Sequence, residues 1–183
     1  MVLNEPDLWG KFPGVISSAP EFTSIIGERL SSSLYPGLSV LLCGDLGSGK
    51  TCLARSIGAA LGVGRMKSPT FTIEAVHKVP GKDYFLVHCD LYRLCQPIPR
   101  ESADDAVFLS IEERLAQGDV ALIEWGEMWR TPPDSDRWDI CISICPDGTR
   151  IFDMSARGVR ALSALSAAYG GILSSAAANE GTH

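Results

Sequence analysis

The chain has 183 residues, enough for one domain of ordinary size and too few for two full-sized ones. Hydrophobic residues make up 45% and charged residues 21%, a globular composition that excludes a disordered or fibrous chain. The 16 Lys and Arg and 22 Asp and Glu give a net charge of −6. We therefore do not expect the protein to bind a nucleic acid backbone by itself, because such binding needs clustered basic residues.

The six cysteines and three histidines show no zinc-ligand spacing, so free thiols are expected. Residues 1–7 lack the basic and then apolar order of a secretory signal, and they are too acidic for a transit peptide. No run of about 18 apolar residues is present. We therefore expect a cytoplasmic protein that does not enter a membrane.

The amino-terminal part of the chain predicts a strand, a helix, a strand, a loop and a second helix. A short strand is expected near 12–16, and apolar residues three and four positions apart predict an amphipathic helix over 20–34. The apolar run 38–43 is typical of a strand buried on both faces, and Gly44 opens a loop. The next helix is expected over 50–61.

The rest of the chain predicts further strands separated by one helix. A Pro-Gly turn joins the first two of these strands as in a hairpin, and a frayed, disordered tail is expected from Gly170. In chain order we expect strands at 71–79 and 84–91, a helix at 102–115, strands at 120–124, 139–145 and 150–154, and a helix at 158–169.

This order of elements indicates the α/β class, with a three-layer α/β/α sandwich of the P-loop NTPase type. Its central sheet is expected to be mixed and mostly parallel, because one connection looks like a hairpin. We expect a single P-loop ATPase domain over 1–157 and a C-terminal helix with a disordered tail over 158–183.

The strongest motif is a full match to the phosphate-binding pattern G-x-x-x-x-G-K-[ST], between a predicted buried strand and a predicted helix. Its residues are Gly44, Asp45, Leu46, Gly47, Ser48, Gly49, Lys50 and Thr51. Loop N–H groups cradle the β-phosphate, Lys50 reaches the β and γ oxygens, and the Thr51 hydroxyl can bind Mg²⁺. The motif predicts a site for a nucleotide and Mg²⁺.

A phosphate loop also needs an acid at the end of a neighbouring strand, and the chain offers two. Asp90 ends the strand that begins at Tyr84, and Glu124 follows Val120–Ile123. Ligands gather beyond the carboxyl ends of strands in α/β sheets, so both acids are expected to face the γ-phosphate. The pattern leaves open which acid binds the metal and which orients water.

Two classes of nucleotide-binding protein are disfavoured by what the sequence lacks. The guanine-specificity motif Asn-Lys-x-Asp is absent, since the two asparagines are Asn4 and Asn179. A small-molecule kinase usually closes an arginine-rich lid over the phosphates. The stretch 97–115 holds Arg100 and Arg114 among five acids, which makes a poor lid.

Over about residues 17–155 the chain resembles the TsaE (YjeE) family, bacterial ATPases needed for the threonylcarbamoyl modification of tRNA. The phosphate loop alone is generic, but three later motifs in order are specific to that family. They are Lys67-Ser68-Pro69-Thr70-Phe71-Thr72, His88-Cys89-Asp90-Leu91-Tyr92-Arg93-Leu94 and Ile123-Glu124-Trp125.

The resemblance implies a role for each matching residue. Thr51 and Glu124 would hold Mg²⁺, Lys50 would bind the phosphates, and Asp90 would be essential for hydrolysis. Lys50 and Asp90 are thus the expected catalytic residues. Trp125 is either a packed aromatic or a ligand contact.

Three more residues are expected at the nucleotide through the resemblance. Ser68 and Thr70 look like a switch segment whose hydroxyls sense the γ-phosphate. Gly148, with Arg150, resembles a family turn that lies near the nucleotide; otherwise it is simply part of a hairpin.

The motifs together predict a slow Mg²⁺-dependent ATPase whose hydrolysis changes the state of a protein assembly. The resemblance implies that this assembly contains TsaD and TsaB, with tRNA reached only through them. One alternative is a nucleotide-gated binding module that needs no hydrolysis, and another is a small-molecule kinase. Rescue by Asp90→Asn would indicate the first, and phosphate on a metabolite the second.

Overall fold

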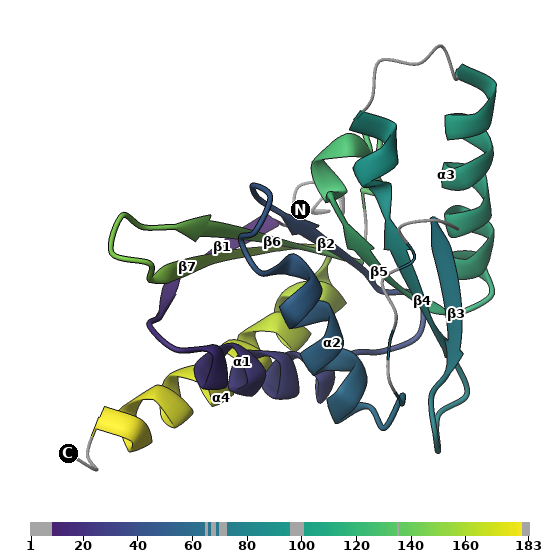
Figure 1. Ribbon diagram of the computed structural model, residues 1–183. Helices are drawn as coiled ribbons and strands as arrows, with labels where there is room; N and C mark the ends of the chain where they lie inside the picture. Colours follow the sequence, from purple (N-terminus) through teal and green to yellow (C-terminus); the bar gives the residue numbers. More distant parts are fainter. Residues whose placement is uncertain are drawn as a thin grey trace, which may run out of the picture.

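The computed structural model describes residues 9–64, 66, 69, 73–95, 101–134 and 136–180. Its centre is one seven-stranded sheet in the order β1-β7-β6-β2-β5-β4-β3 (Figure 1). The strands are β1 (Trp9–Ser17), β2 (Ser39–Cys43), β3 (Glu74–Lys78), β4 (Phe85–Asp90), β5 (Val120–Glu124), β6 (Arg137–Ile144) and β7 (Arg150–Arg157).

The sheet is mixed, as predicted. The neighbouring strands β6, β2, β5 and β4 are parallel, whereas β1, β7 and β3 pair antiparallel with their neighbours. The predicted hairpin is the β3–β4 pair. Parallel pairing is confined to the centre, so the carboxyl ends of β2, β4 and β5 meet at one edge.

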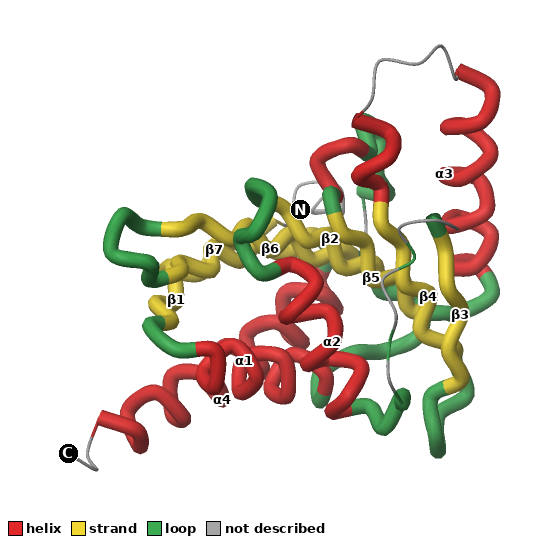
Figure 2. The backbone as a smooth tube through the Cα atoms, in the orientation of Figure 1, coloured by secondary structure: helices red, strands yellow, loops and turns green. Residues whose placement is uncertain are grey.

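Helices cover both faces of the sheet, which confirms the three-layer α/β/α sandwich (Figures 1 and 2). One face carries α1 (Pro20–Ser31), α2 (Lys50–Ala60) and α4 (Val159–Glu180). The other carries α3 (Glu101–Ala116) and two short 3₁₀ turns, η2 (Leu91–Cys95) and η3 (Gly126–Met128). Each face has its own hydrophobic core, because the central strands are buried on both sides.

Side-chain alternation along β4 decides which residues face α2. Leu86 belongs to the core under α1 and α2, while Val87 and Cys89 belong to the core under α3. Since successive side chains point to opposite faces, His88 and Asp90 lie on the α2 side with Leu86. The end of β4 thus presents polar groups toward the phosphate loop.

The last helix is longer than predicted, and the expected disordered tail from Gly170 is wrong as far as Glu180. The Gly-Gly pair is a local stop signal, but packing keeps the helix intact. Ala168 and Ile172, on either side of the pair, are buried in the core that α4 shares with α1 and the sheet. The Ser174 hydroxyl also donates to the Gly170 carbonyl at 2.9 Å.

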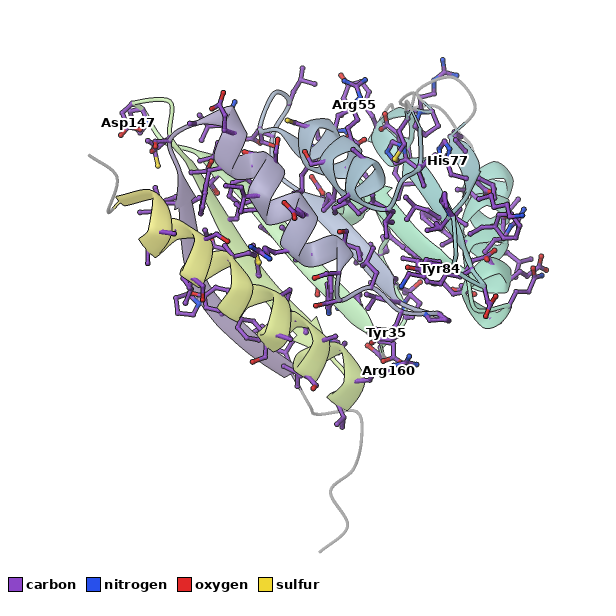
Figure 3. All side chains as sticks on the ribbon, turned by 90° about the horizontal axis from the view of Figure 1, so that it is seen from below. Tyr35, Arg55, His77, Tyr84, Asp147 and Arg160 are labelled. Carbon is purple, nitrogen blue, oxygen red and sulfur yellow. The ribbon has the colours of Figure 1, made fainter. Side chains whose placement is uncertain are left out.

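Helix α4 has the length and composition of a membrane span over Val159–Ala178, with a hydropathy of 1.3. Its inner side, which includes Ala161 and Leu165, is nevertheless part of the core. At its start Arg160 lies over the ring of Tyr35, 3.9 Å from the centroid (Figure 3). Core helices of soluble proteins can have the same length and composition, so these two properties are weak evidence for a membrane span.

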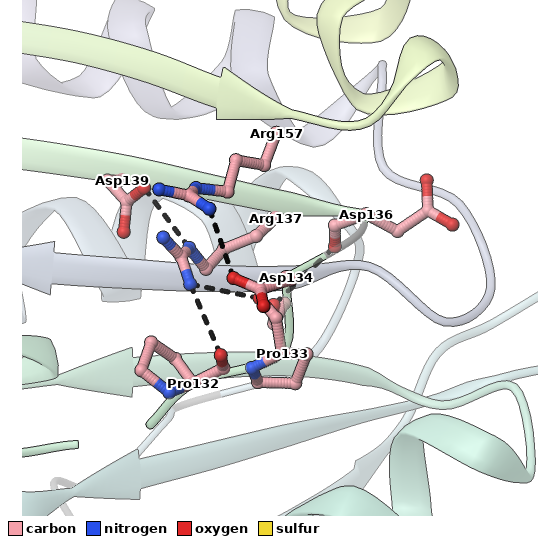
Figure 4. Close-up of polar contacts among 8 residues, drawn as sticks. Pro132, Pro133, Asp134, Asp136, Arg137, Asp139 and Arg157 are labelled. Atoms are coloured by element: carbon pink, nitrogen blue, oxygen red, sulfur yellow. Dashed lines mark hydrogen bonds and ion pairs between the residues drawn. The ribbon is translucent and has the colours of Figure 1, made fainter. Parts of the chain in front are cut away.

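Polar contacts fix the start of β6, the strand next to β2 (Figure 4). The Arg137 guanidinium donates to the carbonyls of Pro133 at 2.9 Å and Pro132 at 3.4 Å, and to Asp139 at 3.2 Å. Arg157 at the end of β7 pairs with Asp134 at 3.0 Å. These bonds tie the connecting segment to both strands and so set where β6 begins beside β2.

Candidate functional site

The phosphate loop lies where β2 ends and α2 begins, as the sequence predicted. Gly44 has φ +128°, and a Cβ there would lie 2.3 Å from the Ile142 carbonyl oxygen. Gly49 has φ +113° and caps α2. Both positions therefore require glycine, because an L side chain is strained at these φ values and Gly44 has no room for one.

The Lys50 ammonium is folded back onto its own loop. Its Nζ donates to the carbonyls of Gly44 at 2.5 Å and Asp45 at 2.9 Å, and the side chain is buried. Burial lowers the pKa of Lys50, against the opposite influence of nearby carboxylates, first among them Glu127 and Glu124. A bound phosphate would supply the full negative charge that the carbonyl oxygens lack.

Trp125 lies directly against this lysine. Lys50 Nζ is 3.7 Å from the centroid of the indole ring, which is a cation–π contact. The centroid of the Tyr92 ring lies 4.9 Å from that of the indole. The backbone of Trp125 is left-handed, with φ 60° and ψ 44°. The indole ring thus packs against Lys50 and Tyr92, and its contact with a ligand stays a prediction.

The two predicted acids are neighbours in register at the ends of β4 and β5, Asp90 opposite Glu124. Both are buried, with 6% and 1% of their surface exposed. The Thr51 hydroxyl donates to Glu124 Oε2 at 2.5 Å, and Asp90 Oδ1 accepts the Tyr92 N–H at 3.1 Å. The structure therefore joins the predicted metal residues Thr51 and Glu124 directly and sets Asp90 beside them.

These oxygen donors fit Mg²⁺ and a nucleotide. A hydroxyl and a carboxylate are hard ligands, and Mg²⁺ usually takes one or two of them with phosphates and waters. Within the described ranges no group of three His, Cys, Asp or Glu side chains forms a closed metal cage. In the loop, the buried Ser48 hydroxyl has no hydrogen-bond partner among the described residues, so it is free to bond a ligand.

The β6–β7 hairpin reaches the phosphate loop through Arg150. The Arg150 Nε–H donates to the Ser48 carbonyl at 2.9 Å, and an added Cβ on Gly49 would meet the same guanidinium at 3.4 Å. Gly148 lies in the hairpin turn, where its N–H donates to the Cys145 carbonyl at 2.9 Å. Arg150 is at the loop, and contact of Gly148 with a nucleotide stays a prediction.

Ser68 and Thr70 lie outside the described residues, so their expected place at the γ-phosphate stays a prediction. Pro69 between them is buried, and its carbonyl accepts the Ile73 N–H at 2.7 Å. The Ile73 carbonyl in turn accepts the Asp90 N–H at 2.9 Å. The end of this segment is therefore tied to the backbone of the predicted catalytic acid.

His88 was not predicted as a site residue. Its ring is fully buried, and Nε2 lies 2.8 Å from Glu124 Oε1. The sequence held one signal, because His88 is two positions before Asp90 and so shares its face of the sheet. Without the register of β4 against β5, that spacing did not reveal Glu124 as its partner.

A groove of about 920 Å³ lies apart from these residues, along the exposed sides of α1 and α2 and the β3–β4 turn. Serine side chains and three charged residues, Glu28, Arg55 and Lys82, contribute to its lining. Among the residues that the structure describes, none of those predicted for the phosphate site lines it. The candidate site is therefore the edge of the sheet and not this groove.

Sequence comparison shows that the chain is similar to one protein family. Residues 17–151 match the model described as TsaE, threonylcarbamoyl adenosine biosynthesis protein. The chain is 42% identical over 103 residues to the Streptomyces coelicolor "tRNA threonylcarbamoyladenosine biosynthesis protein TsaE" and 37% identical over 110 residues to its Mycobacterium tuberculosis namesake. These matches cover 56% and 58% of this chain and slightly less than two thirds, 66% and 64%, of the two relatives.

Longer matches have lower identity. The TsaE of Rickettsia bellii is 30% identical over 145 residues, which cover 76% of this chain and 92% of that protein. The crystal structure of Bacillus subtilis YdiB superposes with a TM-score of 0.69, at 23% identity, over 88% of this chain and 96% of that one. The structural likeness supports the P-loop NTPase-like fold, and the family match spans the phosphate loop and both acids.

Proposed function

The chain belongs to the TsaE family, and from that premise we propose that it is a Mg²⁺-dependent ATPase required for threonylcarbamoyladenosine modification of tRNA. One observation carries the proposal. The Thr51 hydroxyl bonds the buried Glu124 carboxylate at the end of the phosphate loop, with Asp90 on the next strand. This is the donor set that Mg·ATP needs.

Each residue has a distinct part in the proposed reaction. Lys50 and the loop N–H groups offset the charge on the β- and γ-phosphates. Thr51 and Glu124 would hold Mg²⁺, which when bound neutralises the phosphate oxygens and polarises the transferred phosphoryl group. Asp90, which lies opposite Glu124 in register on the adjacent strand, orients the attacking water or accepts its proton.

We infer partners from the family and not from the contacts of this chain. In the proposal the lone protein hydrolyses ATP slowly in the cytoplasm, and TsaB and TsaD complete the stabilisation of the transition state. Those proteins would hold the tRNA, which agrees with the net charge of −6. Hydrolysis would then reset the assembly for another cycle.

The test is phosphate release from Mg·ATP by the protein alone and with TsaB and TsaD, with Lys50→Ala as the blank. The proposal predicts release that rises with the partners, vanishes in the blank, and accompanies a complex in sedimentation. Unchanged turnover with no complex would remove the partners from the proposal. Phosphate transferred to a metabolite would instead favour a kinase.

Asp90→Asn decides whether hydrolysis itself is needed. We expect this variant to bind ATP and to fail in supporting tRNA modification in cells that lack the wild-type chain. Full support by a variant that binds but does not hydrolyse ATP would show a nucleotide-gated binding module instead.

A further inference from the structure

The Glu124 carboxylate has a hydrogen-bonded partner on each oxygen. Oε2 accepts the Thr51 hydroxyl at 2.5 Å, and Oε1 accepts from His88 Nε2 at 2.8 Å. The ring nitrogen is the donor, because a carboxylate only accepts. Glu124 is therefore fixed at two points, one on the phosphate-loop helix and one on β4.

Both partners of this second bond are sealed from water. The side chains of His88 and Glu124 have 0% and 2% of their surface exposed. Without His88, Oε1 would be buried with no donor among the described residues, and a buried acceptor without a donor is costly. The carboxylate would then turn away from Thr51 to find another partner.

His88 stands where an apolar residue would otherwise be expected. It follows Leu86 on the α2 side of β4, and its register partner on β5 is Leu122, also in that core. Its other ring nitrogen, Nδ1, is buried with no hydrogen-bond partner among the described residues. The one polar contact described for this imidazole is the one to Glu124.

We propose that His88 is a positioning residue that holds the Glu124 carboxylate in the orientation needed to receive Mg²⁺ together with Thr51. The inference rests on the proposed function, because it concerns the same metal site. Outer donors of this kind fix the orientation of a ligating carboxylate. His88 itself would touch neither the metal nor the nucleotide.

The experiment measures metal coupling and not turnover. A fluorescent, non-hydrolysable ATP analogue is titrated into the full-length protein with Mg²⁺ and again with EDTA. The ratio of the two dissociation constants reports how strongly the protein–nucleotide complex favours the metal. His88→Leu, which suits the apolar surroundings, should lower this ratio by about 10- to 100-fold and leave binding in EDTA unchanged.

Two further variants separate positioning from packing. Gln places an amide N–H near the position of Nε2, so His88→Gln should restore most of the ratio, whereas Asn reaches only to Nδ1 and should not. The matched control is His77→Leu on the adjacent strand β3, a half-buried histidine whose pKa is lowered by burial and by the charge of the nearby His88, but which has no described hydrogen-bond partner on Nε2 (Figure 3). It should leave the ratio unchanged.

The outcomes distinguish the two claims. A wild-type protein that binds the analogue equally with and without Mg²⁺ would overturn the proposed metal site and this inference with it. A metal-dependent wild type with an unaltered His88→Leu, or with equal losses in Leu and Gln, would overturn the inference alone. Thermal unfolding checks each variant, and if Leu does not fold, the Gln-against-Asn comparison decides.

Discussion

Helix α2, which carries Lys50 and Thr51, is placed by a close approach to α1 at Gly27. A Cβ added to Gly27 would lie 2.5 Å from Ser56 Cβ and 3.1 Å from the Ile57 nitrogen. Carbon atoms in contact are usually about 3.5–4.0 Å apart, so the overlap is roughly 1 Å. Both Cβ atoms are attached directly to helix backbone, and the helices themselves would have to separate.

Gly27→Ala should therefore destabilise the protein even though alanine favours helix. Overpacking of a core typically costs about 1–3 kcal/mol. Replacing a helical glycine by alanine returns up to about 1 kcal/mol. The expected net loss in the free energy of unfolding is up to about 2 kcal/mol, and each 1 kcal/mol lowers Tm by about 2–4 °C at this size.

The decisive assay is a double-mutant cycle followed by urea unfolding. Ser56→Gly removes the Cβ that Gly27→Ala would strike, so the double variant should be more stable than the sum of the single effects by at least about 1 kcal/mol. Nucleotide affinity should fall in Gly27→Ala and recover in the double variant. A single variant as stable as wild type, with a coupling energy below about 0.5 kcal/mol, would refute the close approach.

Three further predictions concern single side chains. The buried Tyr84 hydroxyl lacks a described hydrogen-bond partner, and burial raises the pKa of Tyr84. Because an unpaired buried hydroxyl destabilises the fold, Tyr84→Phe should leave Tm unchanged or raise it at neutral pH. Above about pH 10 the unfolded chain loses that proton first, so wild-type Tm should fall more steeply than that of the variant. Glu124→Gln should abolish the Mg²⁺ dependence of nucleotide binding, whereas Asp90→Asn should keep it and lower turnover by about 100-fold or more. A hydrogen bond from the Cys43 thiol lowers the pKa of Cys141, so Cys43→Ala should slow alkylation of Cys141 near neutral pH, as followed by peptide mass mapping.

Each of these predictions has a contrary result. A Tyr84→Phe variant that unfolds at lower temperature would reveal a partner for the hydroxyl. Metal dependence lost in Asp90→Asn and kept in Glu124→Gln would exchange the roles of the two acids. Equal alkylation rates of Cys141 with and without Cys43 would show that no hydrogen bond joins the two thiols.

The central strands could be predicted because burial on both faces leaves a direct mark on sequence. The runs that became β2 and β5 are almost wholly apolar, and the phosphate loop follows the first of them. The end of α4 could not be predicted in the same way. Gly170 and Gly171 are a local stop signal, and the contacts that override it come from α1 and the sheet, far away in the chain.

The candidate site likewise contains residues that the sequence predicts and contacts that it does not. Asp90 and Glu124 were predicted from their positions at strand ends, and the structure places them side by side. The partner of His88 and the packing of Trp125 on Lys50 depend on strand register and on a left-handed turn. Neither contact corresponds to a residue spacing that can be seen in a single sequence. Both could be found only from the three-dimensional arrangement.

The most direct test of the central claim is phosphate release from ATP by the purified protein, measured with Mg²⁺ and with EDTA. The account predicts slow release that requires Mg²⁺ and is absent from both Lys50→Ala and Thr51→Val. Release that persists in EDTA or in Lys50→Ala, or none from a wild-type protein that binds ATP tightly, would contradict an ATPase site between the phosphate loop and Glu124.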